Sequence, residues 1–174
     1  MKSSQKVLGL IVVAALTGLT VTACSTDGGA PAAQNSTGST QVTTAASNLP
    51  AVTGDQGKAP TIAAPTGSAP TTLVTKDIYV GTGAAAVATS TLTVQYTLMA
   101  WSTGKVVESS WTSQAATFPL SGVIPGWQQG IPGMKVGGRR LLVIPPALGY
   151  GATGSGPIGP NETLIFVVDV LAIK

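Results

Sequence analysis

Residues 123–130, VIPGWQQG, are the stretch from which the fold of this chain is most directly predicted. Pro125 suits the first position of a helix, because the N–H that proline lacks is one that a helix leaves unpaired at its start. Gly130 or Gly133 is the candidate end of that helix. Trp127 lies between two glycines with no helical stripe of apolar residues beside it, so its indole is hard to explain as core filling alone.

Strand patterns surround this predicted helix. Residues 91–99 alternate between apolar and polar side chains, which predicts a strand with one buried face. Residues 138–145 predict a strand that ends at a proline pair, and residues 78–80 predict a short one. Residues 163–173 are almost continuously apolar, which predicts a central strand covered on both faces. One helix and an antiparallel sheet together predict an α+β fold.

Residues 1–23 have the pattern of a secretory signal peptide. Lys2 and Lys6 precede an apolar run of about 15 residues, which is too short to span about 30 Å of hydrocarbon. Residues 21–24, VTAC, resemble the bacterial lipobox, in which the cysteine is lipidated and becomes the mature N-terminus. We therefore expect a lipid anchor on Cys24 that holds an exported protein at the extracytoplasmic face of a bacterial membrane. A plain signal peptide with an incidental cysteine is the alternative.

Two further segments follow. Residues 24–70 are rich in Ser, Thr, Ala, Pro and Gly and show no sustained apolar periodicity. Such a segment buries too little apolar surface to offset the entropy lost on ordering, so we predict a flexible tether. Residues 71–174 hold the strand and helix patterns and are the predicted folded domain.

The composition excludes several function classes. The chain has no histidine, which removes Ser-His and Cys-His nucleophilic catalysis and histidine-ligated metal sites. Its single cysteine leaves no disulfide. A formal net charge of +3 without a basic run argues against a nucleic-acid partner. We expect no cofactor, no metal and a monomer.

Six segments together resemble, in the same order, motifs of the FKBP family, the macrolide-binding peptidyl-prolyl isomerases. The resemblance implies a twisted antiparallel β-sheet wrapped around one short α-helix. It spans essentially the whole predicted domain. The six segments are Val94–Thr97, Gly104–Ser110, residues 123–130, Met134–Arg140, Tyr150–Gly154 and Leu164–Val170.

The resemblance also implies the residues of a pocket. Trp127 would form its floor under a proline ring, the Ile124 backbone N–H would donate to a substrate carbonyl, and the Tyr150 hydroxyl would donate at the rim. Core packing is the alternative for several of these positions. The implied catalytic residues are Tyr96, Glu108, Trp127, Tyr150 and Phe166, and the implied substrate-binding residues are Val107, Phe118, Val123, Ile124 and Ile158.

Three positions depart from the family pattern. Val107 stands where a phenylalanine is usual, which removes apolar contact. Glu108 replaces an aspartate and carries its carboxylate one methylene further out; a solvated strand residue is the alternative for it. Ala116 is smaller than the common aromatic residue. These departures leave the affinity for a macrolide open.

Prolyl isomerisation suits a chain without histidine. Rotation about a peptide bond crosses about 18–20 kcal/mol because the planar amide is stabilised by resonance. A catalyst needs only to favour the twisted, less polar bond in a water-poor cavity. We predict an isomerase that acts on prolyl segments of exported proteins, with a macrolide as a further ligand. The alternative is a non-catalytic peptide-binding or chaperone module that uses the same pocket.

Overall fold

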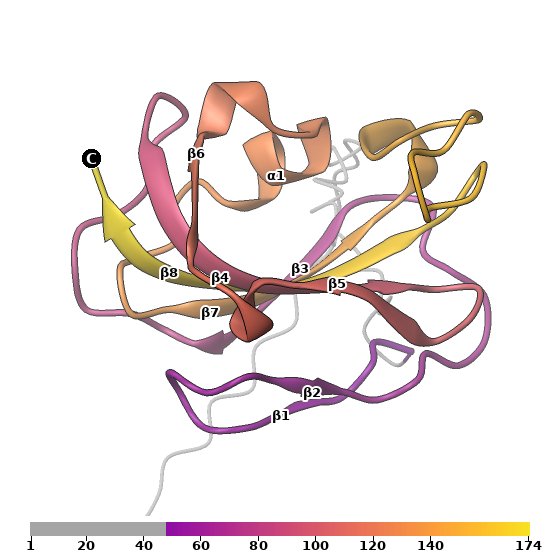
Figure 1. The fold of residues 1–174 in the computed structure, drawn as a ribbon, viewed down its shortest axis with the longest axis horizontal. Coiled ribbons are helices and arrows are strands. Elements are labelled where there is room, and N and C mark those ends of the chain that lie inside the picture. Colours follow the sequence, from indigo (N-terminus) through magenta and orange to yellow (C-terminus); the bar gives the residue numbers. More distant parts are fainter. Residues whose placement is uncertain (1–47) are drawn as a thin grey trace, which may run out of the picture. The chain divides into compact units, whose positions relative to one another are not determined.

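The computed structural model of the protein describes residues 48–174, so the predicted signal peptide, Cys24 and residues 25–47 lie outside the described residues. A sheet of six strands, all paired antiparallel, wraps around α1 (Figure 1). The strands are β1 Val52–Thr53, β2 Thr61–Ile62, β3 Val74–Tyr79, β4 Thr91–Ala100, β5 Lys105–Ser109, β6 Ala116–Pro119, β7 Arg139–Ile144 and β8 Leu164–Ile173, and the helices are α1 Pro125–Gly130 and the 3-10 turns η1 Ser110–Thr112, η2 Leu120–Gly122 and η3 Pro146–Leu148.

The predicted antiparallel α+β fold is confirmed. The strand order is β3-β7-β8-β4-β5, with β6 paired to β4. The predicted strands at 91–99, 138–145 and 163–173 are β4, β7 and β8, and α1 begins at Pro125 and ends at Gly130. The central position of β8 agrees with its nearly continuous apolar run. Within residues 48–174, no helix is long and apolar enough to cross a membrane.

The sheet has an apolar cluster on each face. Along β7, Leu142 and Ile144 face α1, whereas Leu141 and Val143 face the opposite side. This is the two-residue alternation of a strand, with both faces covered. β4 differs from its prediction at its far end, where Thr97 and Met99 on the second face are also buried.

The cover on the second face comes from residues 48–70, where the structure differs from the predicted tether. β1 and β2 pair as a short antiparallel hairpin on the side of the sheet opposite α1 (Figure 1). Leu49, Val52 and Ile62 pack against the apolar cluster of that face. Their apolar partners lie far downstream in the chain, so residues 48–70 carry no local periodicity from which this packing could be predicted.

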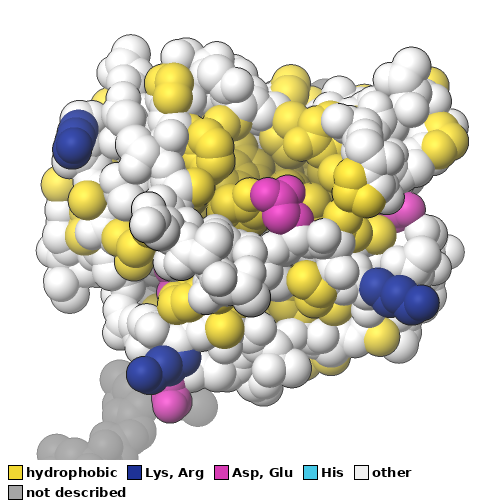
Figure 2. Space-filling view, in the orientation of Figure 1, with side chains coloured by type: hydrophobic (Ala, Val, Ile, Leu, Met, Phe, Trp, Pro, Cys, Tyr) yellow, Lys and Arg dark blue, Asp and Glu magenta, His cyan; other side chains and the backbone are white. Residues whose placement is uncertain are grey.

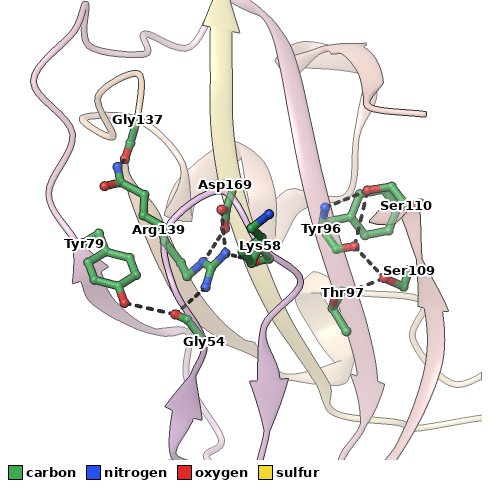
Figure 3. Close-up of polar contacts among 11 residues, drawn as sticks. Gly54, Lys58, Tyr79, Tyr96, Thr97, Ser109, Ser110, Gly137, Arg139 and Asp169 are labelled. Carbon is green, nitrogen blue, oxygen red and sulfur yellow. Dashed lines mark hydrogen bonds and ion pairs between the residues drawn. The ribbon is translucent and has the colours of Figure 1, made fainter. Parts of the chain in front are cut away.

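A buried arginine joins this hairpin to the sheet. Arg139 is fully buried, and its guanidinium pairs with Asp169 on the neighbouring strand, with Nε 2.6 Å from Oδ1. It also donates to the carbonyls of Gly54, at 3.2 Å, and Lys58, and Tyr79 donates to the Gly54 carbonyl at 3.0 Å (Figure 3). A buried charge is costly unless its donors are satisfied. Residues 48–70 are therefore part of the folded domain.

Two glycines set the position of α1 on the sheet. A Cβ atom on Gly126 would lie 2.4 Å from Ile144 Cγ2, and one on Gly130 would lie 2.4 Å from Leu142 Cδ2. Both neighbours are fully buried, so neither has room to move. The spacing of these glycines around Trp127 thus lets the helix backbone rest directly on β7, which fixes the indole over the sheet.

We expect Gly126→Ala to lower the free energy of unfolding by about 1–3 kcal/mol, because the added methyl group forces α1 away from Ile144. Urea unfolding of the full chain measures the change. Gly159→Ala is the matched control, since a Cβ atom there meets nothing within 4 Å. Equal unfolding midpoints for the two variants would contradict the close-packing explanation.

Candidate functional site

An open cavity of about 430 Å³ lies between α1, η2, the strands β4 to β6, β8 and the loop after η3. Figure 2 shows it as a hollow lined with hydrophobic side chains, with an acidic side chain at its edge. The lining residues are Tyr96, Leu98, Glu108, Phe118, Gly122, Val123, Ile124, Trp127, Tyr150 and Phe166.

Aromatic rings surround the indole of Trp127. The ring centroids of Phe166, Tyr96 and Phe118 lie 5.3, 5.8 and 6.1 Å from that of Trp127, with interplanar angles of 84°, 84° and 89°. Edge-to-face pairs at these distances are favourable and hold each ring in place. Trp127 is only 4% exposed, yet it lines the cavity. The rings therefore form a rigid apolar floor and walls.

Tyr96 and Glu108 form the polar pair of the cavity. The Tyr96 hydroxyl on β4 donates to Glu108 Oε1 on β5. Burial raises the pKa of Tyr96, and the hydrogen bond to Glu108 and the negative charge of that carboxylate raise it further. Tyr96 therefore stays protonated. The Tyr96 backbone N–H donates to Ser110 Oγ at 2.9 Å, which fixes this part of β4 against η1 (Figure 3).

Besides the indole N–H of Trp127, which is buried and has no partner in the described part of the chain, two further hydrogen-bond donors at the cavity are free. Neither the Ile124 backbone N–H nor the Tyr150 hydroxyl has a partner among residues 48–174. Ile124 precedes α1, and its carbonyl accepts from the N–H groups of Trp127, at 3.0 Å, and Gln128, at 3.2 Å. The Gln128 side chain in turn donates to the Val123 carbonyl at 2.7 Å. The turn that presents the Ile124 N–H is thus held from both sides.

The structure brings eight of the ten residues implied by the resemblance together around this cavity. Val107 and Ile158 do not line it. A bulge in β5 pairs Glu108 with Leu98 and Val106 with Met99, so Val107 between them has no partner, and its short side chain packs against the core. Ile158 is 7% exposed and belongs to the same core cluster.

Two lining residues were not predicted as site residues. Leu98 follows Tyr96 by two positions, so the alternation of β4 places both on one face, and this signal was sufficient to find it. Gly122 ends η2 beside Val123 and lacks a side chain. Its contribution is main-chain surface that no residue-type pattern indicates.

The residues that line the cavity suit binding of a peptide better than covalent chemistry. It offers an apolar floor and two free donors, Ile124 N–H and Tyr150 hydroxyl, and among its lining residues there is no cysteine, serine, histidine or lysine to act as a nucleophile. Such a cavity can hold a peptide and favour rotation about one of its bonds without making a covalent bond. Peptidyl-prolyl isomerases are the class of protein that such a cavity fits.

Comparison with known proteins specifies the family. The sequence model described as FKBP-type peptidyl-prolyl cis-trans isomerase matches residues 83–171. The chain belongs to the FKBP-type peptidyl-prolyl cis-trans isomerase family.

Relatives and a solved structure agree with this assignment. The chain is 48% identical over 114 residues to a "Probable FK506-binding protein" of Corynebacterium glutamicum, which covers 65% of this chain and 97% of that protein. It is 46% identical over 119 residues to an "FK506-binding protein" of Streptomyces anulatus, with 66% and 96% covered. The crystal structure of FkpA from Escherichia coli is similar with a TM-score of 0.56 and 41% identity, covering 59% of this chain and 48% of that one.

Proposed function

We propose that this protein isomerises Xaa-Pro bonds in the cavity over Trp127 and that it acts on exported proteins while anchored to a membrane through Cys24. The observation that carries the first part is the pairing of an apolar aromatic cavity with two free donors at its edge, Ile124 N–H and Tyr150 hydroxyl. The VTAC motif at residues 21–24 supports the second part.

The cavity favours a half-rotated imide for a physical reason. Rotation removes the resonance that separates charge in the planar amide, so the twisted bond is less polar than either planar form. When a bound peptide displaces water from it, the aromatic cavity therefore stabilises the twisted bond relative to both planar forms. The two free donors bind carbonyl oxygens of the peptide and orient it. A macrolide is proposed as a second ligand of the same cavity.

The isomerase proposal is tested with the full chain and a short Xaa-Pro peptide. We expect the cis-to-trans exchange, which takes tens to hundreds of seconds without a catalyst, to accelerate in proportion to protein concentration. A rate equal to the uncatalysed one, together with retained peptide binding, would leave only the non-catalytic binding module.

Tyr150→Phe is expected to lower kcat/KM for such a peptide by about 3- to 10-fold. The substitution removes one hydrogen bond to the peptide, and such a bond contributes about 0.5–1.5 kcal/mol net of the hydrogen bonds to water that it replaces. The ring and its packing remain, so the free energy of unfolding should not change. Tyr79→Phe is the matched control, because that hydroxyl bonds to Gly54 rather than lining the cavity. An unchanged kcat/KM in Tyr150→Phe would remove this hydroxyl from the mechanism.

Cys24→Ala tests the proposed location. We expect metabolic labelling with a radioactive fatty acid to mark the unmodified protein in a bacterial host, and not this variant, which should leave the membrane fraction. A variant of equal length with Ser25→Ala is the control. Labelling that persists in Cys24→Ala, or its absence in both proteins, would contradict the lipid anchor.

A further inference from the structure

Glu108 is the only charged residue that lines the cavity. Its Oε1 accepts from the Tyr96 hydroxyl, whereas its Oε2 has no hydrogen-bond or ion-pair partner among residues 48–174. The side chain is exposed to solvent. Figure 2 shows an acidic side chain exposed at the edge of the hydrophobic hollow.

Three other side-chain carboxylates of the domain have their own partners, and Asp55, which has none within the described part of the chain, does not line the cavity. Asp77 pairs with Arg140 and Asp169 pairs with Arg139. Both oxygens of Glu162 accept from Ser102. These groups hold the fold together. Glu108 instead leaves one oxygen free at a cavity that no lysine or arginine lines, so its negative charge is not compensated locally.

A lysine or arginine next to the proline of a bound peptide could compensate the negative charge of Glu108. The residues on either side of a proline have their Cα atoms about 3.8 Å from that of the proline when the peptide bonds are trans. Lysine and arginine carry their charge at the end of a long apolar stem, which can lie along the aromatic wall while the charged group reaches the cavity edge. Val107, the residue before Glu108 on β5, packs against the core and does not line the cavity.

We infer that Glu108 determines substrate preference and selects prolines that are flanked by a lysine or an arginine. This inference rests on the proposed function, since it requires the proline to occupy the cavity. Oε2 binds the cationic group while Oε1 keeps its hydrogen bond with Tyr96. A glutamate in the same flanking position is repelled.

The experiment compares peptides that differ only in one charge. In the series Ala-Xaa-Pro-Phe and Ala-Ala-Pro-Xaa, Xaa is lysine, norleucine or glutamate, since norleucine has a similar stem without charge. For the full chain, we expect kcat/KM to be about 2- to 5-fold higher for lysine than for norleucine in at least one series, as for an exposed ion pair at about 0.01 M salt. At about 1 M salt the ratio should approach one.

Glu108→Gln should reduce the lysine-to-norleucine ratio to one at low salt, because the amide keeps an acceptor for Tyr96 but carries no charge. Glu162→Gln is the matched control: it removes one negative charge outside the cavity and should keep the ratio of the unmodified chain. A ratio of one in the unmodified chain in both series, or a ratio that Glu108→Gln leaves unchanged, would overturn the inference.

A binding measurement separates this inference from the proposed function. Dissociation constants for the same peptides follow from the shift of the Ile124 amide signal in NMR titrations. If no peptide is isomerised, the proposed function fails, but the lysine-to-norleucine ratio of the dissociation constants still decides the inference. Tighter binding of the lysine peptide that is lost in Glu108→Gln supports the inference. Equal binding of the two peptides overturns it.

Discussion

Trp127→Ala is expected to lower kcat/KM for an Xaa-Pro peptide by about 10- to 100-fold, because the floor of the cavity loses a large apolar surface worth about 1.5–3 kcal/mol of contact. Three aromatic rings pack edge-to-face against the indole. Its removal therefore also loosens the rings that would shield the rotating bond from water. The loss should fall mainly on kcat, since the twisted imide depends on this surface more than the planar forms do.

The same substitution also removes core packing, and large aromatic-to-alanine changes cost about 3–5 kcal/mol of stability. The assay therefore needs a temperature at which circular dichroism shows the variant to be folded. Trp127→Phe is the matched control, because it retains a ring at the floor, and we expect it to keep an intermediate activity. A folded Trp127→Ala variant with unchanged activity would mean that turnover occurs elsewhere on the protein.

Ile62→Ala is expected to lower the free energy of unfolding of the full chain by about 2–5 kcal/mol, the range for a large-to-small substitution at a buried site. Ile62 is 7% exposed and packs against the sheet from the hairpin of β1 and β2. Thr61→Ala is the matched control, because Thr61 is exposed on the same strand. Chemical denaturation monitored by fluorescence measures both variants.

If residues 48–70 were a flexible tether, both variants would be as stable as the unmodified chain, and that result would contradict the packing. Truncation gives a second measurement. A chain that begins at residue 71 lacks the Gly54 and Lys58 carbonyls to which Arg139 donates, and it exposes the apolar cluster of Met99 and Val143. We expect that fragment to be less stable than the full chain by more than about 3 kcal/mol.

Much of the fold followed from local patterns. Alternation in 91–99 and the continuous apolar run in 163–173 predicted β4 and β8, because the side-chain period of a strand is expressed within a few residues. The helix start was predicted from Pro125, a residue with a strong positional preference. The hairpin of residues 48–70 was not predictable in this way, since it is stabilised by a surface that distant residues build.

The candidate site, too, was predicted from the sequence only in part. Motif positions predicted eight of its ten lining residues, and the period of β4 was sufficient to indicate Leu98 as well. The placement of Val107 outside the cavity depended on a bulge in β5, which is a property of pairing between two strands. The free oxygen of Glu108 is likewise visible only once the partners of every nearby polar group are known.

The sequence by itself determined the strand and helix types, the family and the residue types of the cavity, because these depend on local period and on motifs that lie within short segments. Only the tertiary structure decided that residues 48–70 belong to the domain, which side chains face the cavity and which donors and acceptors remain free. Those properties depend on contacts between residues that are far apart in the chain, such as Arg139 with Gly54, and local sequence carries no signal for such contacts.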